Sequence, residues 1–444
     1  VGANRETTII DGNQAGSVVT FNGGENRDAF LKNFSIINGA GNSISEPEKS
    51  SFGGGIQCYH SSPTLENLLV YNNNAGNESE GGWGQGGGIA IQSGSPLINN
   101  CRIYSNSTGA DGGGLFIASE DGAKLQNVII SENVAGAAGG GIYGEGIFEV
   151  NRSLIKDNYC TTFGAPGIDC SVSDVKIINS VITNNLGGDF SGGLRFQGNG
   201  SKAEIIHSVF WGNSGKEMYI SNDDSLIISY SDIDGDIDSV YSENNGIIEW
   251  GSGNIDVDPM FVDTANGNYH LLADSRLIDA GHPDSTDADG TITDMGAYYY
   301  DQAGQPVRVI NLITTPSLDN VSVKWNATSD AASYNIYRST DGSADFYSLS
   351  PYSTASDTSY VDETAGDNMT YHYRVSAVDD GGDEGILAYS DHGRIGNDTT
   401  ALAMSADDRW ISVPESRSPV FSPEQDYTLE FYFHPLAYQN AVAK

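Results

Sequence analysis

Basic residues are scarce in this 444-residue chain, which holds 21 Lys and Arg against 59 Asp and Glu and carries a formal net charge of −38. A charge of this sign repels phosphate backbones and anionic lipids, which excludes nucleic acid and anionic membranes as partners. No run of about 18 apolar residues exists either, so no membrane insertion is expected. No charged-then-apolar leader opens the sequence, and Val1 is expected to be a mature or trimmed end.

Helical periodicity is also missing from the repeat region, where a glycine cluster followed by an aliphatic residue recurs instead. The copies are Gly53-Gly54-Gly55-Ile56, Gly86-Gly87-Gly88-Ile89, Gly112-Gly113-Gly114-Leu115, Gly139-Gly140-Gly141-Ile142, the degenerate Gly164-Ala165-Pro166-Gly167-Ile168, and Gly192-Gly193-Leu194. Their last glycines are 33, 26, 27, 26 and 26 residues apart. A period in this range is typical of a solenoid.

A second short segment follows each glycine cluster and ends in asparagine. The asparagine column comprises Asn73, Asn106, Asn133, Asn158, Asn185 and Asn213, and the residue three positions earlier is always apolar. Two short strands and several turns per repeat predict coils of a parallel β-helix, with the apolar column inside at a strand spacing of about 4.8 Å. The asparagines are predicted to form a ladder, each amide bonding to its copies one coil above and below.

The four cysteines mostly take the places of core residues. Three of them fall in columns that are apolar in other coils: Cys58 and Cys170 share the column of Ile91, Ile117 and Phe196, and Cys101 shares that of Leu68 and Val128. These three are expected to be buried thiols. Cys160 is expected in a turn, from which a bridge to Cys170 would need a distorted coil, so the cysteines leave the redox compartment open.

On these repeats, roughly residues 1–300 resemble the right-handed parallel β-helix superfamily, the pectate-lyase-like fold, and especially its bacterial surface and secreted proteins. The resemblance implies an all-β chain with coils over residues 1–250. A different string begins at Asn254-Ile255-Asp256-Val257-Asp258 and resembles the closing segment of many secreted bacterial β-helix proteins. It implies that residues 251–303 cap the open end of the solenoid, which would otherwise expose an unpaired edge.

An acidic loop inside this predicted cap, residues 284–294, places acids at alternate positions with Gly290 for the turn. Calcium prefers oxygen-rich loops of this kind, so Asp287, Asp289 and Asp294 are predicted ligands of a structural Ca²⁺ ion. The pattern is partial, because Tyr298 stands where a calcium loop would place Glu. A plain acidic turn is the alternative.

Two further modules are expected after the solenoid. Alternating segments at residues 321–325, 334–338 and 371–378, with one Trp at position 325, resemble a fibronectin type III domain over residues 304–397 and imply a spacer. Residues 398–444 resemble the opening strands of a laminin-G or concanavalin-like jelly roll. That fold needs well over a hundred residues, so the sequence is expected to end inside a domain.

No catalytic row emerges from the outward position after each glycine cluster, one residue beyond the aliphatic one, which reads Gln57, Ala90, Phe116, Tyr143, Asp169 and Arg195. Asp169 and Arg195 would stack one coil apart, and a surface salt bridge is predicted for them. Asp223-Asp224 lacks any companion motif of the β-helix glycosidases. His207 falls in a column otherwise mostly asparagine, which predicts a turn role.

A glycan contact is predicted at Trp83, which lies in the irregular insertion of residues 77–85. Insertions in solenoids map to surface loops, and an exposed indole among glycines can stack on a sugar ring. The alternative is a tryptophan folded back on its own coil.

Three functions are compatible with these features. The favoured hypothesis is a non-catalytic, secreted or cell-surface modular protein acting in adhesion, in binding a polysaccharide or cell-surface glycan, or as an extracellular scaffold. The second is a polysaccharide lyase or glycoside hydrolase of the β-helix class. The third is a subunit of an extracellular filament that associates with further copies. The functional prediction depends on the fold resemblance, since no catalytic residue is assigned.

Overall fold

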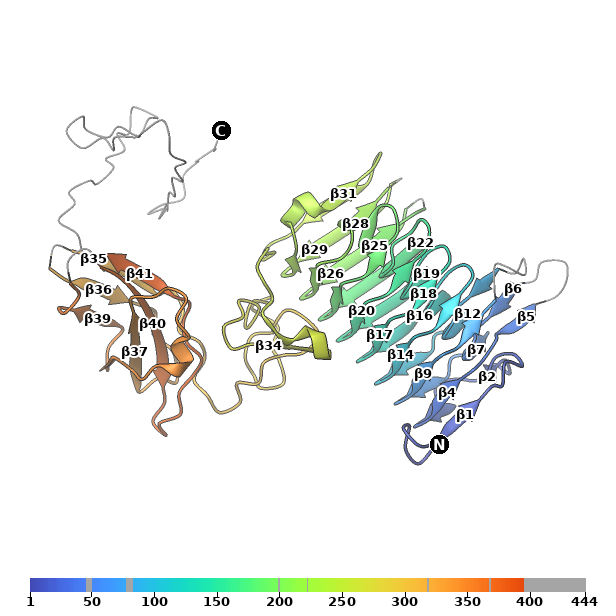
Figure 1. The fold of residues 1–444 in the computed structure, drawn as a ribbon, viewed down its shortest axis with the longest axis horizontal. Coiled ribbons are helices and arrows are strands. Elements are labelled where there is room, and N and C mark those ends of the chain that lie inside the picture. The colour runs from blue at the N-terminus through green and yellow to red at the C-terminus, as the bar shows by residue number, and fades with distance from the viewer. Residues whose placement is uncertain are drawn as a thin grey trace.

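A computed structural model describes residues 1–44, 50–76, 83–198, 200–221, 223–317, 319–366 and 369–394. The predicted jelly-roll strands at residues 398–444 lie outside these described residues. The chain is all-β: parallel sheets form the coils, and an antiparallel sandwich follows (Figure 1). No helix within the described ranges has the length and apolar character needed to cross a membrane.

One parallel sheet, here sheet A, takes one three-residue strand from most coils. Its strands, in spatial order, are β1 (Ile9–Asp11), β4 (Ser35–Ile37), β9 (Leu69–Tyr71), β14 (Arg102–Tyr104), β17 (Ile129–Ser131), β20 (Leu154–Lys156), β23 (Val181–Thr183), β27 (Val209–Trp211) and β30 (Asp232–Ile233). The middle residue of each strand points into the coil, as Val70, Ile103 and Ile130 do. The two flanking residues therefore face outward.

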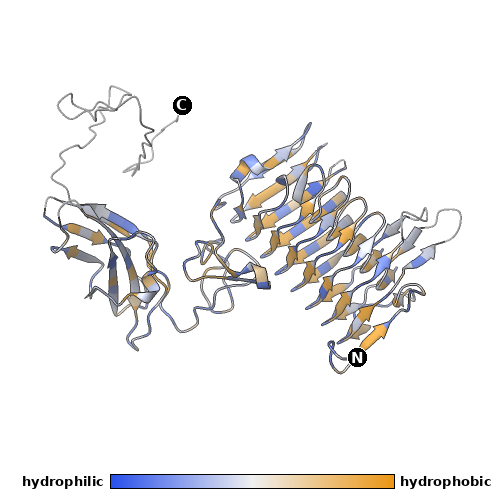
Figure 2. Cartoon of the chain, in the orientation of Figure 1, coloured by the Kyte–Doolittle hydropathy of each residue, from blue (hydrophilic) through white to orange (hydrophobic). Residues whose placement is uncertain are grey.

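The opposite wall, sheet B, is longer and branched. One branch contains β2 (Val19–Phe21), β7 (Ile56–Tyr59), β12 (Ile89–Gln92), β16 (Leu115–Gln126), β19 (Ile142–Asn151), β22 (Ile168–Ile178), β25 (Ser191–Phe196), β28 (Lys216–Ile220) and β31 (Val240–Ser242). The other adds β3 (Phe30–Lys32), β8 (Thr64–Glu66), β13 (Leu97–Asn99), β26 (Lys202–Ile206), β29 (Ser225–Ser229) and β32 (Ile247–Trp250). Both pack inward onto sheet A, and hydrophobic residues recur in strand after strand (Figure 2).

Two small sheets complete the coils. The corner after sheet A is built by the paired two-residue strands β10 (Asn74–Ala75), β15 (Ser107–Thr108), β18 (Val134–Ala135), β21 (Tyr159–Cys160) and β24 (Leu186–Gly187). Near the irregular first repeat, β5 (Asn42–Ile44), β6 (Ser50–Phe52) and β11 (Gly84–Gln85) form a separate sheet. Cys160 lies in a strand rather than in the predicted turn, and all four cysteines are buried and free.

The asparagine ladder is continuous through the coil interior. In each step the side-chain Nδ2 donates to the Oδ1 of the next asparagine at 2.9–3.0 Å, and the backbone N–H donates to the same oxygen. Nδ2 also donates to a backbone carbonyl of the preceding coil, as Asn158 does to Ile130 at 3.0 Å. The ladder ends at Glu217, whose carboxylate accepts from the backbone and side chain of Asn213. The turn polar groups are thus satisfied without water.

Asn254 and Ile255 bond to the last coil at the open end of the solenoid, and the rest of the predicted cap, up to residue 303, runs along the side of the coils. Ile248 and Trp250 in the last coil pack against the coil core, while the following segment turns back over the outer face of sheet A. It includes β33 (Phe261–Asp263), η3 (Thr264–Asn266) and β34 (Asn268–Leu271), and is called the covering segment below. The physical reason is an apolar outward row, which would otherwise be exposed: Ile129, Leu154, Val181 and Val209.

The sandwich pairs β35 (Ile313–Pro316), β36 (Val321–Lys324) and β39 (Ser359–Asp362) in one antiparallel sheet, and β38 (Ser353–Ala355), β37 (Ser333–Ser339), β40 (Thr370–Val378) and β41 (Asp391–Arg394) in the other. This is the arrangement of a fibronectin type III-like domain, and the predicted Trp325 is buried in its core. A short 3₁₀ turn, η4 (Phe346–Ser348), lies on the side toward the covering segment.

The sandwich is docked on the covering segment rather than loosely tethered. Arg374 forms an ion pair with Asp274 at 2.6 Å, and Arg308 donates to the carbonyl of Ala273 at 2.8 Å. Tyr389 donates to the carbonyl of Ser275 at 3.2 Å. The sandwich therefore contacts the covering segment at residues 273–276, and its Ile386 joins the apolar cluster on the outer face of sheet A.

Candidate functional site

The outer face of sheet A carries the side chains that build a candidate binding site. Its second outward column reads Tyr71, Tyr104, Ser131, Lys156, Thr183 and Trp211, one residue per coil. Tyr71 and Tyr104 stack with ring centroids 4.9 Å apart. Asp11 and Ile37 precede Tyr71 in the same column; from Tyr71 to Trp211 it is aromatic at both ends and polar in the middle, and the covering segment passes over its second half.

An open groove of about 820 Å³ lies where this column meets the covering segment. Trp211 and Lys156 line it from sheet A, and Phe261 and Tyr269 line it from β33 and β34. The Lys156 ammonium lies 5.7 Å from the centre of the Tyr269 ring. We call this the aromatic groove; its volume suits an oligosaccharide segment or another small ligand.

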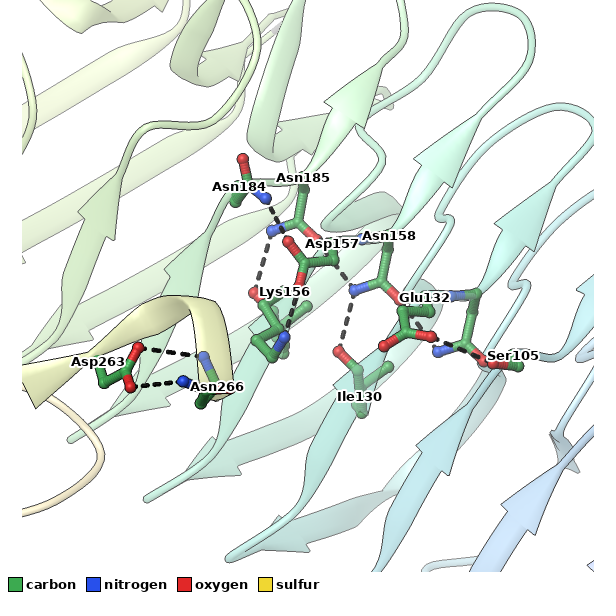
Figure 3. Close-up of polar contacts among 12 residues, drawn as sticks. Ser105, Ile130, Glu132, Lys156, Asp157, Asn158, Asn184, Asn185, Asp263 and Asn266 are labelled. Atoms are coloured by element: carbon green, nitrogen blue, oxygen red, sulfur yellow. Dashed lines mark hydrogen bonds and ion pairs between the residues drawn. The ribbon is translucent and has the colours of Figure 1, made fainter. Parts of the chain in front are cut away.

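Carboxylates and amides line one wall of the aromatic groove (Figure 3). They come from a left-handed turn that follows each strand of sheet A, where Glu132, Asp157 and Asn184 have φ of 56°, 53° and 52°. Since Ser131 and Lys156 are paired across β17 and β20, Glu132 and Asp157 are neighbours on adjacent coils. Asp157 forms an ion pair with Lys156 and accepts a hydrogen bond from Asn184.

The opposite wall uses its acids to hold its own turns. Asp258 accepts from the backbone N–H of Met260 at 2.9 Å. In the adjoining turn, Asp263 accepts from the backbone and side-chain nitrogens of Asn266 at 3.2 and 2.6 Å (Figure 3). These contacts fix the loop that roofs the groove, so the site is preformed in the folded chain.

Sequence reasoning did not identify the aromatic groove, because its walls come from residues about a hundred positions apart. The one available signal was Trp211, which falls in the same repeat position as Tyr71 and Tyr104. Trp83, the predicted glycan contact, is 68% exposed and lies outside the groove beside β11. Its indole is not folded back on the coil, and sugar stacking there stays a prediction.

The three predicted calcium ligands are occupied by backbone donors. Asp287 accepts from the N–H of Asp294 at 2.7 Å, and Asp294 accepts from the N–H groups of Asp279 and Tyr300 at 2.7 and 2.6 Å. Asp289 accepts from Thr291 and Gln302. Within the described ranges, no group of three or more acidic, His or Cys side chains gathers as a metal site would require. Calcium binding at this loop stays a prediction.

The predicted surface salt bridge between Asp169 and Arg195 is wrong in one respect, because the pair is buried. Arg195 Nε donates to Asp169 Oδ2 at 2.7 Å, and both side chains are almost fully covered. Their column is outward-facing, but Ala138 and neighbouring turn residues pack over its apolar members Ala90, Phe116 and Tyr143. Burial raises the pKa of Asp169 to about 6, although Arg195 and the Ala165 N–H act to lower it.

The other paired acids and the predicted turn histidine are structural. Asp224 is buried and accepts from the backbone N–H of Ser201 at 2.8 Å, while Asp223 occupies a left-handed turn with φ of 63°. His207 also occupies a left-handed turn, with φ of 52°, as its column predicts. Its Nε2 accepts from the N–H of His282 at 3.0 Å, which ties the coils to the covering segment.

Protonation of His207 is expected to loosen the covering segment. Burial, with the nearby His282, lowers the pKa of His207 to about 4 from an ordinary 6.5. Below pH 6.5, His207 binds a proton in the unfolded chain but stays neutral in the folded chain. Its contribution to the free energy of unfolding is therefore fully present above pH 6.5 and is lost as the pH falls toward 4. We expect about 3 kcal/mol of pH-dependent loss from this group, measured by thermal unfolding between pH 7 and pH 4.

A His207→Gln variant serves as the comparison, because it keeps a neutral acceptor that does not titrate. The difference between the two pH profiles isolates His207 from the carboxylates that titrate in both proteins. Parallel profiles would contradict the assignment.

The fold defines the class: an all-β modular protein in which a parallel β-helix is joined to a fibronectin type III-like sandwich. No family model matches the chain. A stretch of 129 residues, 29% of the chain, is 28% identical to an amylopullulanase of Thermoanaerobacter thermohydrosulfuricus and spans 8% of that protein. The chain therefore covers less than a tenth of this relative.

Solved structures match over short regions. A Fn3-like protein from Clostridium thermocellum is 27% identical over 20% of this chain and 86% of its own, with a TM-score of 0.17. A beta-1,2-glucanase from Parabacteroides distasonis is 21% identical over 24% of this chain and 15% of its own, with a TM-score of 0.18. These scores are too low to support an argument, so the architecture rests on the strand pairing described above.

Proposed function

We propose that this protein is a non-catalytic, extracellular glycan-binding protein whose aromatic groove holds a segment of polysaccharide. The observation that carries the proposal is the juxtaposition of the half-buried rings of Trp211 and Phe261 with Glu132, Asp157 and Asn184 in one preformed groove, beside the buried Tyr269. Aromatic faces pack on sugar rings, and carboxylate and amide groups bond to sugar hydroxyls. The partial similarity to an amylopullulanase supports a carbohydrate-related context.

Binding is favoured over hydrolysis by the placement of the acids. Glycosidases place two carboxylates on either side of the bond to be cut, one of them free to give up a proton. Here the adjacent pair, Glu132 and Asp157, stands on one wall, and Asp157 is bound to Lys156 and Asn184. On the opposite wall, Asp258 is bound to its own turn. The groove thus supports adhesion or attachment to a glycan rather than turnover.

The test is isothermal titration of the intact chain with a panel of oligosaccharides, alongside a reducing-end assay. Trp211→Leu keeps apolar contact with its neighbours and removes the flat ring, and it should weaken binding about tenfold, or ~1.4 kcal/mol. Phe163→Ala, an exposed aromatic outside the groove, is the matched control and should leave binding unchanged.

Three results would contradict the proposal. Unchanged affinity in Trp211→Leu would remove the aromatic groove as the site. Loss of binding in Trp83→Ala instead would move the site to the first-repeat insertion. Release of reducing ends that disappears in Glu132→Gln would make the protein a hydrolase.

A further inference from the structure

A second cleft, of about 480 Å³, lies beside the aromatic groove under the same covering segment. Its walls include Arg5, Arg102 and Arg152 from the coils, and His270 and Tyr298 from the covering segment. Tyr269 and His270 are consecutive in β34; the first lines the aromatic groove and the second lines this cleft. We call it the arginine cleft.

The arginine cleft is basic, although the protein as a whole is strongly acidic. The chain holds 59 Asp and Glu against 21 Lys and Arg, yet among the described residues that line the cleft there are three arginines and no carboxylate. Arg5 forms an ion pair with the exposed Glu6 at 3.4 Å and donates to the Asn100 carbonyl at 3.3 Å, and Arg152 forms an ion pair with Asp287 at 3.6 Å. Arg102 makes no ion pair with any described residue. Its guanidinium lies 5.6 Å from the centre of the Tyr104 ring, and the side chain is exposed, so its N–H donors can reach a ligand.

The backbone conformation of Arg152 also supports a functional role for this cleft. It occupies a left-handed turn, φ 48°, in the column that coils on either side fill with Asn100, Asn127 and Asn179. Asparagine tolerates this conformation far better than a long side chain does, so an arginine there carries a conformational cost. Residues held at such a cost concentrate at functional sites.

The remaining wall offers a flat face. The rings of His270 and Tyr298 stack with centroids 4.6 Å apart and an interplanar angle of 21°. A planar guanidinium bonds a carboxylate or sulfate through two parallel N–H donors, which an ammonium cannot do. The cleft thus combines oxyanion donors with an aromatic surface on the scale of one or two sugar rings.

We propose that the arginine cleft binds the carboxylate or sulfate substituent of an anionic saccharide, with Arg102 as its principal contact and Arg5 and Arg152 beside it. The inference rests on the proposed function for the saccharide and adds the class of ligand, an acidic one. The net charge of −38 opposes a polyanion at long range. At 0.15 M salt distant acids are screened beyond about 8 Å, while groups in direct contact are not.

The experiment is calorimetric titration at 0.15 M salt with three trisaccharides: a uronic acid trimer, its neutral methyl ester, and a sulfated trimer. We expect the intact chain to bind one of the acidic trimers at least tenfold more tightly than the ester. Arg102→Gln should abolish that preference, so that the acidic trimer binds no more tightly than the ester does. Which acidic trimer binds distinguishes carboxylate from sulfate as the recognised group.

Arg27→Gln is the matched control, since Arg27 is an exposed arginine outside the cleft, and it should keep the full preference. Equal affinity for acidic and neutral trimers, or a preference that survives Arg102→Gln, would overturn the inference. The two proposals fail separately. Neutral binding that Trp211→Leu removes, without acid preference, would sustain the groove alone, whereas acid binding lost only in Arg102→Gln would sustain the cleft alone.

Discussion

Replacing Asn158 by alanine is expected to lower the midpoint of thermal unfolding by about 10 °C. In the ladder, Asn158 Oδ1 accepts from the backbone and side chain of Asn133, and its Nδ2 donates to Asn185 and to the Ile130 carbonyl. The alanine leaves these buried groups without partners, at about 1–3 kcal/mol each, and leaves a small cavity. A total near 4 kcal/mol corresponds to that shift for a domain of this size.

The measurement is a circular-dichroism melt of the intact chain, with Asn72→Gly as its control. Asn72 lies next to the ladder in a left-handed turn, φ 55°, but is exposed, and glycine adopts that conformation freely. The control should melt within 2 °C of the parent. Equal shifts in both variants would mean that turn geometry, and not the ladder, stabilises the coils.

Arg195→Met is expected to destabilise the coils by about 3–5 kcal/mol, because it leaves the Asp169 carboxylate buried without its cation. Asp169 also accepts from the Ala165 N–H and Gln197 Nε2, so its position is fixed by three donors. A folded-state pKa raised to about 6 means that stability falls as the pH rises from 4 through 6. Removing Arg195 raises that pKa further, so the loss should be greater at pH 8 than at pH 5.

The double variant Asp169→Asn with Arg195→Met completes the cycle. An amide and a thioether have no buried charge to neutralise, so most of the stability should return. Thermal unfolding at pH 8 and pH 5 of the parent, both single variants and the double variant measures the coupling. If the losses of stability in the two single variants simply add in the double variant, side-chain packing and not charge pairing stabilises this column.

The two columns behind these predictions mark the limits of what the sequence predicts. Asn158 and the apolar residue three positions before it recur at fixed spacing. In a parallel coil, equal spacing places equivalent residues on top of one another. Repetition alone therefore predicts the ladder and the core, including the buried Cys58, Cys101 and Cys170. Burial of Asp169 depends on the residues that cover its column from outside, and the spacing of the repeats does not predict them.

The two clefts proposed as binding sites were harder to predict for a related reason. The covering segment has no repeat, so neither its path along sheet A nor the meeting of Arg102 with Tyr298 follows from periodicity. Deviations within columns were the usable signal. Arg152 stands among asparagines, and Trp211 stands where earlier coils have tyrosine; both line clefts under the covering segment.

The docked sandwich has a mechanical consequence. A pull applied at the sandwich reaches the covering segment along the backbone and through the contacts of Arg374, Arg308 and Tyr389 with residues 273–275, before it reaches the coils. The coils resist such tension along many parallel strand pairs, but the covering segment is held to them by side-chain packing and a few bonds such as that of His282 to His207. Tension would detach this segment first. Because the segment forms one wall of each cleft, the affinity for a ligand bound there would fall under tension.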